Sequence, residues 1–74
     1  MTHERAQDIA THNGLGEVHF QFNIAKNTGK EFEVGYVNVK GMRELFCKRQ
    51  SYSLVNEFYL CNEFRELDTP TPNI

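Results

Sequence analysis

Two stretches with apolar residues at every second position constrain the fold of this chain more than any other feature. Such residues occupy positions 18, 20, 22 and 24, and again 32, 34 and 36. A period of two is typical of a strand with one buried face. The segment between the stretches is Lys26-Asn27-Thr28-Gly29-Lys30. The pattern therefore predicts a β-hairpin over residues 17–39.

The connecting segment predicts the register of this hairpin. It suits a three-residue loop, a type I turn followed by a left-handed glycine at Gly29. Such a loop sets Lys26 opposite Lys30 and brings the apolar side chains onto one face. The predicted pairs are Ile24 with Phe32, Phe22 with Val34, and Phe20 with Tyr36.

The Thr28-Gly29-Lys30 turn resembles the first hairpin of ubiquitin-like domains. The resemblance covers the turn alone and implies a strand–strand–helix–strand layout, with no function attached. Beyond Tyr36 the alternation changes phase, because Val37 and Val39 take the positions that glutamates held before. This change predicts a bulge at Gly35, or else a strand end that is covered on both faces.

After Gly41, three apolar residues are spaced i, i+3, i+4 at Met42, Leu45 and Phe46. This spacing predicts a helix over about 42–50 that packs on the hairpin. Residues 52–60 fit either a strand or a helix, and their aromatic and β-branched content favours a third strand. The expected fold class is α+β, a small antiparallel sheet packed by a short helix.

The ends of the chain are expected to differ from its middle. Residues 1–14 predict either a short helix, with Thr2 as N-cap and Ile9 docked on the body, or a mobile segment. Residues 15–67 form the single α+β domain, since 74 residues suffice for one. Residues 68–74 contain two prolines and predict a mobile tail.

Composition favours a cytoplasmic protein. No apolar run approaches the length that spans a bilayer, and residues 1–11 lack the apolar core of a signal peptide. Cys47 and Cys61 form no Cys-x-x-Cys pair, which favours reduced thiols. The net charge of −2 argues against general affinity for nucleic acid.

The sequence contains no spacing typical of catalysis, a metal or a cofactor. The histidines and cysteines show no paired ligands for zinc, and surface histidine is the better interpretation of His3, His12 and His19. Cys61 lies among aromatic residues and is expected to be an inert buried thiol. Cys47 precedes Lys48 and Arg49, which predicts a lowered pKa. We therefore expect no enzyme, no metal site and no cofactor.

The sequence feature that most favours a function is a cluster of basic residues that could bind a partner. Basic residues gather between positions 40 and 49, against the single carboxylate of Glu44. The predicted partner-binding residues are Lys40, Arg43, Lys48 and Arg49, with Phe46 and Tyr52 beside them.

The aromatic content is high for this length, and exposed aromatics mark interaction sites. The leading hypothesis is a non-enzymatic protein-binding module that regulates or inhibits a larger partner. In size and lack of motifs the chain resembles the small accessory proteins of phages and mobile elements, some of which bind host transcription machinery or a defence complex. The alternative is a nucleic-acid-binding domain that uses the basic 40–49 segment. A second alternative is a structural homo-oligomer or homodimer joined through a sheet edge.

Overall fold

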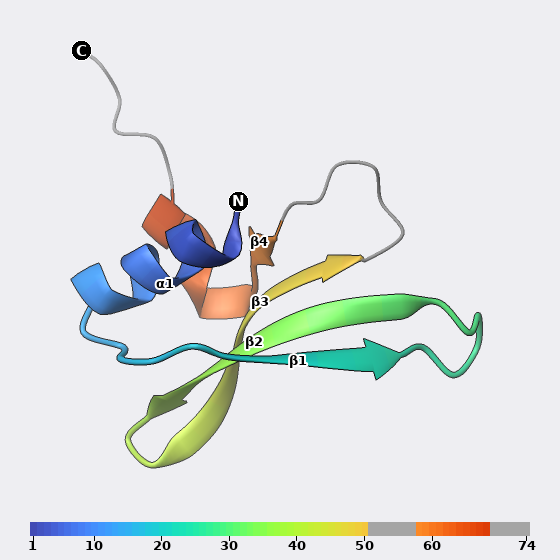
Figure 1. The fold of residues 1–74 in the computed structure, drawn as a ribbon. Helices are drawn as coiled ribbons and strands as arrows, with labels where there is room; N and C mark the ends of the chain where they lie inside the picture. Colours follow the sequence, from blue (N-terminus) through green and yellow to red (C-terminus); the bar gives the residue numbers. More distant parts are fainter. Residues whose placement is uncertain (51–57, 69–74) are drawn as a thin grey trace.

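A computed structural model describes residues 1–50 and 58–68 (Figure 1). The sheet is antiparallel, with strand order β1-β2-β3-β4. This four-stranded sheet with a short N-terminal helix confirms the predicted α+β class. The elements in chain order are α1 (His3–His12), β1 (His19–Ile24), β2 (Glu31–Val39), β3 (Met42–Gln50), β4 (Tyr59–Leu60) and the 3-10 helix η1 (Asn62–Asp68).

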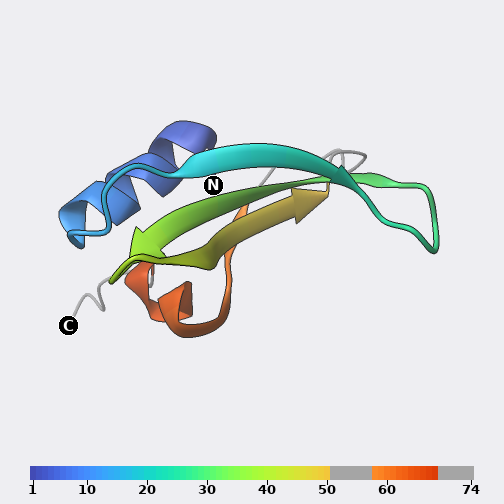
Figure 2. The same ribbon diagram turned by 90° about the horizontal axis from the view of Figure 1, so that it is seen from below.

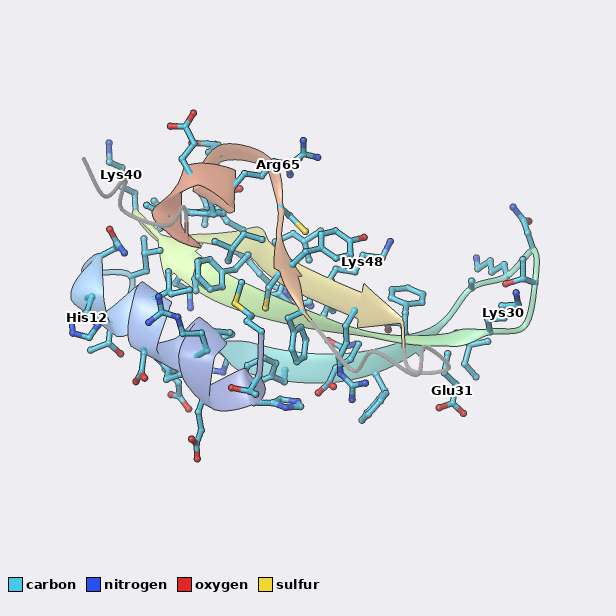
Figure 3. The ribbon with its side chains drawn as sticks, turned by 90° about the horizontal axis from the view of Figure 1, so that it is seen from above. His12, Lys30, Glu31, Lys40, Lys48 and Arg65 are labelled. Carbon is cyan, nitrogen blue, oxygen red and sulfur yellow. The ribbon has the colours of Figure 1, made fainter. Side chains whose placement is uncertain are left out.

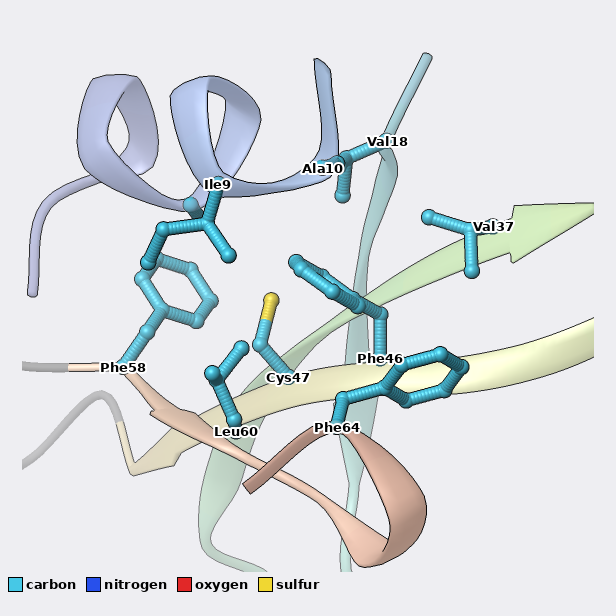
Figure 4. Close-up of a cluster of buried hydrophobic side chains, with 10 residues drawn as sticks. Ile9, Ala10, Val18, Val37, Phe46, Cys47, Phe58, Leu60 and Phe64 are labelled. Atoms are coloured by element: carbon cyan, nitrogen blue, oxygen red, sulfur yellow. The ribbon is translucent and has the colours of Figure 1, made fainter. Parts of the chain in front are cut away.

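The helices α1 and η1 both lie on one face of the sheet, which we call the inner face (Figures 1 and 3). The opposite face, on which no helix of the described residues lies, is the outer face. The core lies between the helices and the inner face, where side chains of α1, the strands and η1 meet (Figure 4). Its buried members are Ala6, Ile9, Ala10, Val18, Val37, Phe46, Cys47, Phe58, Leu60 and Phe64.

Helix α1 begins and ends where its capping residues predict. The Thr2 side chain accepts a hydrogen bond from the Arg5 N–H at 3.1 Å, which is the geometry of an N-cap. At the other end, Asn13 donates its backbone N–H to the Ile9 and Ala10 carbonyls. A ten-residue helix is marginal alone, and burial of Ile9 against the sheet supplies the missing stability.

The β1–β2 hairpin forms, but its predicted register is wrong by one residue. The loop has four residues, Lys26 to Gly29, because Ala25 donates its N–H to Lys30 and accepts one from Gly29. Gly29 is left-handed as predicted, with φ of 69°. The longer loop pairs Ile24 with Glu31, Phe22 with Glu33 and Phe20 with Gly35.

This register puts apolar side chains of β2 on both faces of the sheet. Val37 and Val39 share the inner face with Gly35, while Phe32, Val34 and Tyr36 point to the outer face. Gly35 makes the register possible, because an added Cβ would lie 2.6 Å from Cys47 Sγ and 2.8 Å from Val18 Cγ1. The phase change after Tyr36 is thus explained without an extra residue in β2.

The helix predicted over 42–50 is wrong, because these residues form strand β3. Lys40 and Gly41 both have positive φ, 54° and 79°, as the two central residues of a type I′ hairpin turn require. The turn pairs Val39 with Met42 and returns the chain antiparallel to β2. The strand–strand–helix–strand layout that the ubiquitin-like turn implied is therefore absent from the described part of the chain.

A bulge in β3 explains the helix-like spacing of its apolar residues. The β2–β3 register shifts between Gly35 and Tyr36, whose partners are Cys47 and Leu45. The extra residue is therefore Phe46 in β3, not a residue of β2 as predicted. The bulge lets two successive side chains, Phe46 and Cys47, enter the core (Figure 4).

The strand predicted over 52–60 lies largely outside the described residues. Its end, Tyr59–Leu60, is β4 and pairs with β3. The segment after it is the 3-10 helix η1. Among residues 1–50 and 58–68, no helix is long and apolar enough to cross a membrane.

Candidate functional site

The structure does not gather the predicted partner-binding residues into one patch. Phe46 is completely buried in the core, so it offers no surface to a partner in the folded protein. Arg49 is also buried, on the inner face. Tyr52 lies outside the described residues. The remaining three, Lys40, Arg43 and Lys48, lie at the β2–β3 turn and on the outer face.

The buried guanidinium of Arg49 pairs with the buried carboxylate of Glu33. Glu33 Oε1 lies 2.9 Å from Arg49 Nε and 2.7 Å from Nη2. Its other oxygen, Oε2, lies 2.9 Å from His3 Nε2. The imidazole of His3 also packs edge-on against Phe20 and Phe58, with ring centroids 4.7 Å apart in both cases. This cluster ties α1 to the sheet and has a structural role.

Strand β1 is an edge of the sheet (Figure 2), so half of its backbone polar groups point away from β2. Ala25 donates its N–H to Lys30 at 2.9 Å, so this pair is hydrogen-bonded. Hydrogen-bonded and non-hydrogen-bonded pairs alternate in an antiparallel ladder. The N–H and C=O groups of Phe20, Phe22 and Ile24 therefore point outward. We call this row, with its side chains, the β1 edge.

One end of the edge is closed by a side chain of α1. Gln7 accepts the outward N–H of Val18 at Oε1 and donates Nε2 to the Gly16 carbonyl, both at 2.9 Å. Its carboxamide occupies the place of a neighbouring strand. Within residues 1–50 and 58–68, nothing forms a hydrogen bond to the outward groups of Phe22 or Ile24.

The side chains of the β1 edge become more exposed along the strand. Val18 is buried and Phe20 is half-buried beneath the start of α1. Phe22 is 58% exposed and Ile24 66% exposed, although both point to the inner face. The apolar row thus continues past the region that α1 covers and ends in solvent.

The outer face carries two aromatic side chains, each with a cation beside its ring. The Arg43 guanidinium lies 3.8 Å from the Tyr36 ring centroid and donates Nη2 to Gln21 Oε1 at 3.2 Å. The Lys48 ammonium lies 4.9 Å from the Phe32 ring centroid. These side chains are held in place by contacts within the sheet face.

A hollow of about 360 Å³ opens beside the Arg43–Tyr36 pair. Within the described chain, the Asn38 carboxamide at its rim forms no hydrogen bond. The hollow lies at the end of the sheet near the β2–β3 turn, and most of its lining residues take outer-face positions. Its lining residues are His19, Phe20, Gln21, Tyr36, Val37, Asn38 and Arg43.

Both cysteines are free and buried, and neither suits nucleophilic chemistry. Burial, reinforced by the nearby Cys61, raises the pKa of Cys47 to about 12. The lowered pKa predicted from Lys48 and Arg49 is therefore wrong. Burial also raises the pKa of Cys61. No group of three or more histidine, cysteine or acidic side chains suitable for a metal occurs in the described residues.

The sequence interpretation missed the β1 edge, the Gln7 side chain that closes one end of it, and the Arg43–Tyr36 pair. The first two depend on where α1 docks, which no local pattern encodes. The pair depends on the β2–β3 turn, for which Lys40-Gly41 is a weaker signal than Asn-Gly. Comparisons with protein-family models, with curated proteins and with solved structures find no match to this chain.

Proposed function

We propose that this chain is a non-enzymatic protein-binding module that regulates or inhibits a larger partner through the β1 edge. An extended segment of the partner adds to the sheet beside Phe20, Phe22 and Ile24. The observation that supports this most is the open row of backbone donors and acceptors next to two exposed apolar side chains. Strand addition uses both, since main-chain bonds give affinity and alternate side chains give specificity.

The β1 edge lacks the features with which proteins protect an edge strand. Natural edges carry charges, proline or bulges, or they are very short. The strand from His19 to Ile24 contains no lysine, arginine, acidic residue or proline. The opposite edge, β4, has only two residues. Of the two edge strands in the described residues, β1 therefore offers the longer row of backbone groups.

The chemistry of the edge defines the partner segment. A strand beside β1 would direct alternate side chains to the inner face, next to Phe22 and Ile24, where apolar groups are favoured. Its other side chains would lie beside the uncharged Gln21 and Asn23 on the outer face. We therefore expect an extended partner segment with alternating apolar and polar residues. The two buried free thiols fit a reducing compartment, and we place the protein in the cytoplasm.

The test compares two substitutions of equally exposed apolar residues. Ile24→Lys puts a charge on the β1 edge, whereas Met42→Lys puts one at the start of β3, where Met42 is 65% exposed. In quantitative capture from host lysate, the amount of the specific partner that is captured should fall roughly tenfold or more with Ile24→Lys and stay unchanged with Met42→Lys. Equal capture by both variants would contradict the proposal.

Hydrogen exchange with the purified partner tests the mode of binding. The outward amides of Phe20, Phe22 and Ile24 should gain protection in the complex, because they become hydrogen-bonded. Protection elsewhere, with these amides unchanged, would reject strand addition. Concentration-dependent protection of the same amides without any partner would instead identify a second copy of this chain as the occupant, and would also overturn the proposal.

A further inference from the structure

We propose that the outer face of the sheet binds single-stranded nucleic acid, at the Arg43–Tyr36 pair and the adjoining hollow. This activity is separate from strand addition at β1 and does not rest on it. The Arg43 guanidinium lies over the Tyr36 ring, with its central carbon 3.8 Å from the ring centroid, and a hydrogen bond to Gln21 holds it there, so it offers a positioned planar group to a ligand. Unpaired bases stack on aromatic rings and on arginine planes, while arginine also binds phosphate.

The charged groups of the strands are sorted between the two faces. The register places Glu31, Glu33 and Glu44 opposite Ile24, Phe22 and Val37, which are inner-face positions. Arg43 and Lys48 take outer-face positions, opposite Asn38 and Val34. Among the described residues of β1–β3, no carboxylate shares the outer face. The face is therefore locally cationic although the chain has a net charge of −2.

Aromatic side chains follow the same face. Phe32 and Tyr36 are four residues apart on β2 and so are separated by about 13 Å along the strand. Tyr59 lies opposite Lys48 on β4 and is 52% exposed. Rings interleaved with cations are the surface that a single strand of nucleic acid requires, because bases stack while phosphates pair.

The hollow supplies polar groups for a base edge. The Gln21 carboxamide already forms two hydrogen bonds: Oε1 accepts from Arg43 Nη2 at 3.2 Å, and Nε2 donates to Asn23 Oδ1 at 3.3 Å. Asn38 is exposed at the rim, and its carboxamide offers both a donor and an acceptor. An acidic peptide would use the cations but would leave the exposed Tyr59 ring and the Asn38 carboxamide unused. The face is therefore more complementary to nucleic acid than to carboxylates alone.

The experiment is fluorescence anisotropy with labelled oligothymidylate and oligouridylate at low salt. Arg43→Gln should weaken binding by roughly fivefold or more, because a stacking surface and a charge are lost together. The matched control is Lys26→Gln, which removes the same charge from the exposed hairpin tip and should change affinity by less than about twofold. With Lys40, Arg43 and Lys48 as phosphate contacts, log K should fall with log salt at a slope of about −2.

Three results would overturn the proposal. The first is no anisotropy change with either oligonucleotide at low salt. The second is an equal loss of affinity in Lys26→Gln, which would show unspecific attraction. The third is displacement of the oligonucleotide by polyglutamate at the same charge concentration, which would identify an acidic protein surface as the ligand. If Arg43→Gln lowers the melting temperature below the assay temperature, Lys48→Gln tests the same face and should also weaken binding.

Discussion

Glu33 and Arg49 face each other across β2 and β3, and their charged groups meet beneath α1 at 2.7 and 2.9 Å. The pair explains how a glutamate can occupy an inner-face position next to Phe22 and Phe20. A charge in such a place is tolerated only when it is paired and hydrogen-bonded.

Removing the charge of Glu33 should destabilise the protein strongly. We expect Glu33→Gln to lower the free energy of unfolding by about 3 kcal/mol, because the guanidinium of Arg49 stays buried beside a neutral amide. Glu44→Gln, a matched change on the neighbouring strand, should stay within about 0.5 kcal/mol. Urea denaturation measures both. Similar values for the two variants would mean that the buried pair is not what holds β2 and β3 together at this point.

Gly35→Ala should also destabilise the protein, through overpacking rather than charge. The new Cβ would meet Cys47 Sγ at 2.6 Å and Val18 Cγ1 at 2.8 Å, so we expect a loss of about 1–3 kcal/mol. Adding Cys47→Ala removes the sulfur that the new Cβ would meet. The loss of unfolding free energy in the double variant should therefore be smaller than the sum of the two single losses by about 0.5 kcal/mol or more. Strictly additive changes in urea denaturation would show that the sulfur is not the obstacle.

The buried thiol of Cys47 should make stability decline in alkaline solution. Its pKa is about 12 in the folded protein, against 9.0 for an unperturbed thiol. Between these values the unfolded chain loses a proton that the folded chain keeps, so unfolding is favoured as pH rises. The slope should approach about 1.4 kcal/mol per pH unit for this group. Urea midpoints from pH 8 upward should fall less steeply in Cys47→Ala, and equal slopes would reject this assignment.

Lys40→Asn should stabilise the β2–β3 hairpin. Lys40 has φ of 54°, a conformation that disfavours most side chains and that asparagine tolerates better. We expect the free energy of unfolding to rise by about 0.5 kcal/mol. Gly41→Ala, at φ of 79°, should instead lower it by about 1 kcal/mol. Thermal denaturation of both variants tests the turn, and a helix at 42–50 would respond to neither change in this way.

The α+β class, the first hairpin and the left-handed Gly29 could all be predicted from local patterns. The register could not, because it depends on one residue of loop length. The observed register sets Phe22 beside Glu33 and Phe20 beside Gly35. These pairs are unfavourable by themselves, and they are explained by the contacts of Glu33 with Arg49 and His3 and by the close approach of Cys47 to Gly35. Those partners are distant in sequence, so no local pattern identifies them.

The predicted helix at 42–50 failed for a related reason. A spacing of i, i+3, i+4 marks one face of a helix, but a bulged strand produces it as well. In β3 the bulge at Phe46 shifts the alternation, so Phe46 and Cys47 both turn inward. In a strand, successive side chains point to opposite faces, so the predicted basic residues of this segment divide between the two faces of the sheet. Only Arg43 and Lys48 kept a common surface.

The carboxamide of Gln7 has a consequence for how the sheet can grow. It imitates a peptide group and occupies the binding positions at Gly16 and Val18. An incoming strand therefore meets a stop at Val18 and finds vacant backbone only alongside Phe20 to Ile24. The docking of α1 would thus set a maximum length for any strand that adds to β1.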